Sequence, residues 1–244
     1  MRQPMTPDAT GTVDIYEGRD PVGIAAYSIP EASDILKIPA STIRYWVSGA
    51  PRRTRAGRRY EPVIRAADVE ANRLSFQNLV ELHVLRAIRR QHQVDLPSVR
   101  RAIAYLRRRF GAAHPLLAHC LFAEPGGIVV EAEEGLVDAS AEGQLVIPEV
   151  VDKLLARVDA PGGAPTRLYP YVTTKLEDGL RPVWVDPRIE FGRPCLVGTG
   201  IRTDAIADQF LAGDTPDDLA ADYERSTAEI LGVIRYELGR RHAA

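Results

Sequence analysis

Long hydrophobic runs are absent from this sequence of 244 residues. No stretch approaches the roughly 20 consecutive apolar residues that a membrane-spanning helix needs. Residues 1–20 also contain no apolar core of the kind that a signal peptide requires. We therefore expect a cytoplasmic protein without a membrane partner.

Cysteine is scarce. Cys120 and Cys195 lie far apart in the sequence and outside any CxxC spacing. This argues against a disulfide framework or a zinc site and favours two free, buried thiols.

Residues that carry catalysis are few and scattered. The five histidines form no cluster, and no nucleophile–base pair or pair of carboxylates can be picked out. Ser28 and Ser226 are better explained as helix caps than as nucleophiles. We expect no enzymatic activity, no cofactor and no metal.

Charge is unevenly distributed, although the formal net charge is only −2. Residues 40–110 hold 16 arginines and five acids, a net charge of +11, so the rest of the chain carries −13. A basic block is typical of a polyanion partner, because each neutralised phosphate releases condensed counterions. Arginines also commonly solvate helix faces, so the block indicates DNA only if it contains a groove-reading element.

Residues 27–49 predict such an element, two short helices joined by a tight turn. Ser28 and Glu31 give a capping-box pattern at the start of the first helix, and Lys37–Pro39 end it. A second amphipathic helix follows from the spacing of Ile43, Trp46 and Val47. Its start and its other face present the residues that we expect to contact DNA in the major groove: Ser41, Thr42, Arg44 and Tyr45.

The segment PRRTRAGRRYEP follows the second helix and predicts a hairpin. Gly57 supplies the positive φ that a tight turn favours. The hairpin would form a wing that holds five arginines against the phosphate backbone: Arg52, Arg53, Arg55, Arg58 and Arg59. Two further helices are predicted by apolar stripes in residues 76–88 and 97–110.

Residues 27–93 resemble the DNA-binding domain of the MerR-like winged-helix regulators. The motifs that carry the resemblance are Thr42-Ile43-Arg44-Tyr45-Trp46 and Arg58-Arg59-Tyr60. Pro39 departs from the family, which usually has a Ser or Thr helix cap there, so the second helix would start differently. The resemblance implies a winged helix-turn-helix domain with following helices over residues 27–110, after a flexible arm of residues 1–26.

Residues 111–182 contain eight glycines and seven prolines, which indicates short elements joined by turns. Residues 127–130 and 143–147 predict strands, and residues 150–158 predict a helix. We expect a short mixed α/β segment. The sequence leaves three roles open for it: effector binding, dimerisation and partner binding.

Residues 183–244 predict a C-terminal module of three helices with helix-turn-helix character. Gly213 ends a helix, Thr215 and Pro216 begin the next, and Ser226 with Glu229 repeats the capping box.

The segment resembles the family called "domain of unknown function 433", which is found in antitoxins. The resemblance rests on the motifs Asp186-Pro187, Gly192-Arg193-Pro194-Cys195, Gly198-Thr199-Gly200-Ile201 and Ala212-Gly213-Asp214-Thr215-Pro216. The family commonly has an Arg where this chain has Gly200.

The C-terminal module is acidic, with eight acids and one arginine over residues 203–229. Because this surface would repel phosphates, we expect it to bind protein, either a second copy of the chain or a basic toxin. The acids expected to contact the partner are Asp204, Asp208, Asp217, Asp218 and Asp222.

Together these features predict a mainly α protein and an antitoxin of a type II toxin–antitoxin system. The resemblance implies a PIN-like ribonuclease toxin as partner, bound by the acidic half. The winged helix would repress the operon by binding double-stranded operator DNA, as a homodimer on a (pseudo)palindromic site. The alternative is a small-molecule-responsive MerR-like transcription regulator that uses the middle segment as its sensor.

Overall fold

The computed structural model describes most of the chain. The described residues are 16, 18–49, 61–91, 93–111, 113–117, 121–124, 127–132, 135–138, 144–145, 158–159, 165–171 and 180–241. Among them, no helix combines the length and the apolar character that crossing a bilayer would take.

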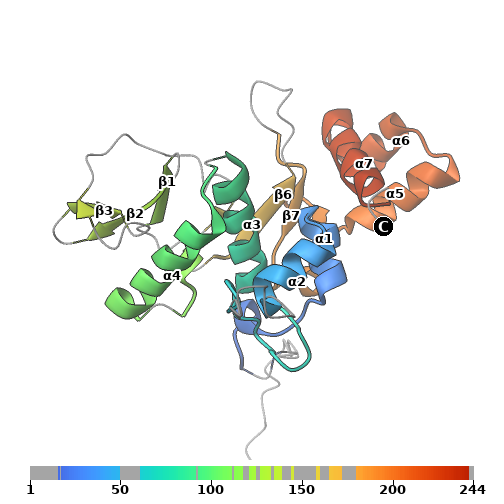
Figure 1. Cartoon of the computed structure of the whole chain (residues 1–244). Coiled ribbons are helices and arrows are strands. Elements are labelled where there is room, and N and C mark those ends of the chain that lie inside the picture. Colours follow the sequence, from blue (N-terminus) through green and yellow to red (C-terminus); the bar gives the residue numbers. More distant parts are fainter. Residues whose placement is uncertain are drawn as a thin grey trace, which may run out of the picture.

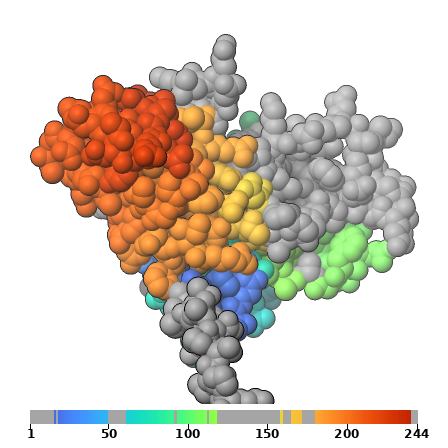
Figure 2. Space-filling model, turned by 180° about the vertical axis from the view of Figure 1, so that it is seen from behind, coloured from blue at the N-terminus to red at the C-terminus, as the bar shows by residue number. Residues whose placement is uncertain are grey.

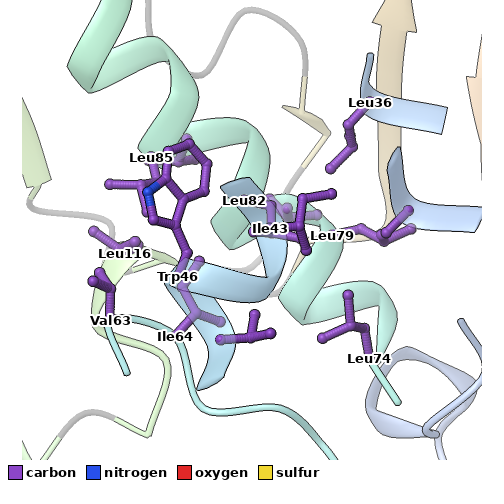
Figure 3. Packing of buried hydrophobic residues seen from close by; sticks show 14 of the residues in the cluster. Leu36, Ile43, Trp46, Val63, Ile64, Leu74, Leu79, Leu82, Leu85 and Leu116 are labelled. Carbon is purple, nitrogen blue, oxygen red and sulfur yellow. The ribbon is translucent and has the colours of Figure 1, made fainter. Parts of the chain in front are cut away.

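The N-terminal half is helical, as the apolar spacing predicts. A single 3₁₀ turn, η1 (Pro21–Gly23), precedes two short helices and two longer ones: α1 (Ile29–Leu36), α2 (Ala40–Ser48), α3 (Phe76–Gln91) and α4 (Leu96–Phe110). Figure 3 shows Ile43 and Trp46 of α2 beside the leucines of α3, in the core that these helices share. Burial of these side chains fixes α2 on α3 and leaves its other face to solvent.

The middle segment forms one small antiparallel sheet after the 3₁₀ turn η2 (Pro115–Leu117). Its strands follow chain order: β1 (Leu121–Glu124), β2 (Gly127–Ala132), β3 (Gly135–Asp138) and β4 (Gln144–Leu145). The two predicted strands correspond to β2 and β4. The predicted helix lies outside the described residues except at its last position, Val158, which belongs to a strand.

A second antiparallel sheet joins the middle segment to the C-terminal one. Its order is again that of the chain: β5 (Val158–Asp159), β6 (Arg167–Tyr171), β7 (Val183–Val185) and β8 (Cys195–Leu196). Leu168 pairs with Val185 and Trp184 with Cys195, and Leu168 and Val185 are part of the core of the N-terminal half. The segment predicted as purely helical therefore also contributes two strands.

Three helices follow the second sheet, in agreement with the prediction: α5 (Thr203–Ala212), α6 (Pro216–Asp222) and α7 (Thr227–Arg241). The predicted caps are present. Gly213 ends α5 at φ 120°, the Thr215 side chain accepts the Asp218 N–H, and Ser226 and Glu229 exchange both bonds of a capping box. These helices pack on one another around a core of their own. In Figure 1 they lie on the opposite side of the molecule from the sheet of β1–β3, and the space-filling view of Figure 2 shows them (red) on the opposite side from α4 (green).

Candidate nucleic-acid interface and partner surface

The turn between α1 and α2 is defined by local hydrogen bonds. Ser28 and Glu31 form the predicted capping box, with the Ser28 N–H donating to the Glu31 carboxylate at 2.7 Å. Lys37 ends α1 in the left-handed region at φ 55°, and the Ser33 hydroxyl donates to the Ile38 carbonyl at 2.6 Å. The chain thus turns within three residues, and α2 begins at a fixed angle to α1.

Helix α2 presents one solvent-exposed stripe. Pro39 is its N-cap residue and makes no side-chain capping bond, whereas Ile43, Trp46 and Val47 are buried. Of the residues predicted to contact bases, Ser41, Arg44 and Tyr45 are exposed and Thr42 is half-buried. Ser41, Arg44, Tyr45 and Ser48 share the spacing of a single helix face. The structure thus brings together three of the four predicted contact residues of α2, and Thr42 lies beside them.

The chain that returns from the predicted wing is tied to the end of α2. The Trp46 carbonyl accepts the N–H groups of Val63 and Ile64 at 2.8 and 3.1 Å, and the Ser48 hydroxyl donates to the Asn72 side chain at 3.1 Å. Arg52, Arg53, Arg55, Arg58 and Arg59 themselves lie outside the described residues. A wing on this segment therefore remains a prediction.

A buried polar network supports the segment that follows. Asn78 is fully buried, and its carbonyl oxygen accepts the N–H groups of Ala67 and Ser75 at 2.9 and 3.1 Å. Its amide donates to the Arg65 carbonyl at 3.0 Å and to Glu81 at 3.1 Å. Sequence reasoning missed this network, and the one available signal was a polar Asn inside the apolar stripe of α3.

His114 completes the network. Its Nδ1 lies 3.1 Å from the Glu81 carboxylate, which is itself almost fully buried. The hydrogen bond with Glu81 raises the pKa of His114 above its ordinary value, against the opposing effects of burial and of Arg107. The pair thus holds the start of the segment after α4 against α3. A cavity of about 680 Å³ lies beside it, lined in part by Arg65, Arg107 and His114.

Tyrosine hydroxyls connect α1 and the chain before it to the C-terminal module. Tyr27 donates to the Gly192 carbonyl at 3.1 Å, Tyr236 of α7 donates to the Ile35 carbonyl at 3.1 Å, and Tyr16 donates to the Pro187 carbonyl at 2.8 Å. We call these contacts the tyrosine seam. It places the C-terminal module directly against the first helix of the candidate DNA-binding element.

Cys195 lies next to this seam. Its thiol is buried and free, as predicted, and burial raises its pKa to about 12. A thiol in this state is inert at neutral pH, which makes Cys195 a packing residue. Cys120 lies outside the described residues.

The acidic surface of α5 and α6 is partly engaged in local bonds. Of the five predicted contact acids, Asp208, Asp217, Asp218 and Asp222 are exposed, whereas Asp204 is half-buried and paired with Arg202. Asp217 and Asp218 also accept threonine hydroxyls at 2.8 and 2.6 Å. The exposed Leu211 lies on α5 and adds an apolar contact point.

Comparison with known proteins identifies part of the chain. Residues 183–236 match the family described as "Protein of unknown function (DUF433)", so a DUF433 domain is present. It begins at β7 and ends at Tyr236. The three C-terminal residues of the seam, Pro187, Gly192 and Tyr236, therefore all fall within it.

Two relatives from Mycobacterium tuberculosis (strain ATCC 25618 / H37Rv) align over most of the chain. "Uncharacterized protein Rv2308" is 27% identical over 89% of this chain and 94% of its own length. "Putative antitoxin VapB45" is 29% identical over 82% of this chain and 88% of its own length. A crystal structure of Rv2018 from Mycobacterium tuberculosis shares the fold, with a TM-score of 0.58 and 22% identity over 88% of this chain and 98% of that one.

Proposed function

We propose that the chain is a DNA-binding antitoxin that acts without enzymatic activity. It neutralises a PIN-like ribonuclease toxin through its acidic C-terminal half and represses its own operon, as a homodimer, through the basic winged helix. The observation that carries the proposal is the alignment, over most of both chains, with a relative named as an antitoxin. The DUF433 domain supports the same role.

The DNA-binding part of the proposal is supported by α1, its three-residue turn and α2. Two short helices joined in this way are typical of a helix-turn-helix, whose second helix enters the major groove. The exposed stripe of α2 carries Arg44 in its middle, within a block of net charge +11. An arginine at this position suits bidentate recognition of a guanine edge.

Replacement of Arg44 by alanine should weaken binding to the upstream region of the gene by about 1–3 kcal/mol, because one base contact is lost. Binding to a scrambled duplex should change far less. Gel shifts at constant salt with both duplexes measure the difference. Arg235→Ala, which removes an exposed arginine from α7, is the matched control and should bind like the wild type. Equal binding by the two variants would exclude α2 as the reading helix.

The toxin-binding part is supported by the exposed acids of α5 and α6 and by the exposed Leu211 of α5. Arg225, the single arginine among them, is half-buried, so it offsets little of the surface charge. Such a surface complements a basic partner and would speed its association.

Neutralising the acidic surface should reduce toxin capture at least tenfold, because several rim charges are lost together. The variant Asp208→Asn/Asp217→Asn/Asp222→Asn keeps the side-chain shapes and the oxygen that accepts the Thr227 hydroxyl. The association rate with the product of the neighbouring gene is measured by surface plasmon resonance. The control Asp34→Asn/Glu61→Gln/Glu70→Gln removes three charges from the other half of the chain. A toxin that associates equally fast with both triple variants binds elsewhere.

The alternative, a small-molecule-responsive regulator, has one observation in its favour. The cavity of about 680 Å³ beside His114 falls within the roughly 300–1,000 Å³ of small-molecule sites. Most of its lining comes from the segment after the predicted wing, and the middle segment contributes only its first residues, Ala113 and His114. A ligand there would act on the base of the wing.

A further inference from the structure

A second cavity, of about 270 Å³, lies at the turn between α1 and α2. We call it the turn cleft. Among the described residues that line it, none is acidic and four are cationic: Lys37, Arg86, Arg89 and Arg90. The remaining lining includes Pro39 and Thr42, at the start of α2.

The three arginines follow one another on a single face of α3, at the spacing i, i+3 and i+4. Arg86 is anchored, because its guanidinium donates to the Leu36 carbonyl at the end of α1. Arg89 and Arg90 are exposed and make no hydrogen bond or ion pair to another described residue. Like charges at this spacing destabilise a helix. The negative C-terminal end of the α3 dipole offsets that cost only for arginines in the last turn of the helix.

The opposite wall of the turn cleft adds positive potential. Lys37 is held there by its left-handed backbone and by a position 4.5 Å from the centre of the Tyr236 ring. Pro39 precedes α2 as its N-cap and makes no side-chain capping bond, so no capping side chain offsets the partial positive charge of the first N–H groups of the helix. The arginine face of α3 and the first turn of α2 thus line one cavity, and an anion is the group that complements them.

We propose that the turn cleft binds a phosphate, and that this phosphate belongs to the DNA backbone beside the groove that α2 enters. The second half of the proposal rests on the DNA-binding function proposed above. The volume is compatible with it, since about 270 Å³ is enough to admit a phosphate group. Thr42 lies beside the exposed stripe of α2, so a backbone phosphate reaches the cleft while Arg44 faces the bases.

The test uses the full chain with Arg89→Gln/Arg90→Gln, which leaves the anchored Arg86 in place. Binding to the upstream duplex and to a scrambled duplex is measured by fluorescence anisotropy over a series of salt concentrations. We expect the slope of log K against log [salt] to become shallower by about one, the value for one phosphate. Affinity near 0.1 M salt should fall about five- to tenfold on both duplexes alike. The control Arg181→Gln/Arg235→Gln removes the same charge from two exposed positions outside the basic block and should keep the wild-type slope.

A slope equal to that of the control, in a variant that melts like the wild type, would overturn the assignment to a backbone phosphate. Titration with inorganic phosphate distinguishes a site for a DNA phosphate from a site for free phosphate. In one outcome the wild type binds phosphate at submillimolar concentration and the variant fails to do so, while the salt slope on DNA is the same in both. That result assigns the cleft to free phosphate and overturns its role on DNA. If the proposed DNA-binding function itself is wrong, the result differs, because the wild type then binds neither duplex. In that case phosphate binding lost in the variant supports the phosphate site, and no phosphate binding by the wild type rejects it.

Discussion

Substitution of Gly192 by alanine should destabilise the chain by about 3 kcal/mol, at the upper end of ordinary point mutations. A Cβ at this position would lie 1.8 Å from the Tyr27 hydroxyl oxygen and 2.9 Å from its Cζ, and the backbone is in the left-handed region at φ 74°. Tyr27 is buried, so its ring has no room to retreat. The clash would therefore open the tyrosine seam between α1 and the DUF433 domain.

The two tryptophans report the two sides of this seam. Trp46 lies in the N-terminal core and Trp184 in the C-terminal sheet. Urea unfolding followed by fluorescence, with each tryptophan in turn replaced by phenylalanine, gives the free energy of unfolding for each side. We expect one shared transition in the wild type and two separate transitions in Gly192→Ala.

Gly198→Ala is the matched control. Its φ of 73° imposes the same backbone strain, while the nearest atom to its Cβ would be 3.5 Å away. It should cost about 1–2 kcal/mol, the strain alone. A second check is the background Tyr27→Phe, in which the hydroxyl is gone and Gly192→Ala should cost less. If Gly192→Ala and Gly198→Ala are equally stable, the close approach at the seam does not matter for folding.

The seam also accounts for the backbone conformation of the loop at Gly192. Glu190 and Phe191 also have positive φ, at 47° and 54°, so the loop turns left-handedly through three successive residues. Such strain persists only where surrounding contacts impose it. Here the imposed contact is the Tyr27–Gly192 hydrogen bond, and it fixes the DUF433 domain on α1.

Features with local causes could be predicted from the sequence. The caps at Ser28, Thr215 and Ser226 depend on residues three positions apart, and all three are present. The exposed stripe of α2 followed from helical spacing alone. The alignment with a relative named as an antitoxin agrees with the predicted role, while its DNA and toxin contacts stay predictions.

Features that join distant segments could not be predicted. Pairing of β6 with β7 joins residues 17 positions apart, and the Tyr236–Ile35 bond joins residues 201 apart. No single-sequence periodicity encodes such partners, so the second sheet and the seam went unpredicted. The turn cleft belongs to the same class, because its arginines come from α3 and its other wall from α1 and α2.

Asn78→Ala should be as damaging as Gly192→Ala, with an expected loss of about 3–4 kcal/mol in the free energy of unfolding. The change removes four hydrogen bonds and leaves the N–H groups of Ala67 and Ser75 and the Arg65 carbonyl without their side-chain partner. Unsatisfied buried polar groups cost about 1–3 kcal/mol each, more than the bonds contribute when made.

The loss should appear first in the segment after the predicted wing. Hydrogen exchange of the Ala67 and Ser75 amides should accelerate more than that of α2, because Asn78 is the side chain that holds both. Gln77→Ala, the neighbouring and half-buried position on α3, should leave both amides protected. Since residues 65–67 follow the wing arginines, the Asn78 variant should also weaken non-specific DNA binding while Arg44 remains exposed on α2. Fast amide exchange with undiminished DNA binding would mean that the wing does not depend on this anchor.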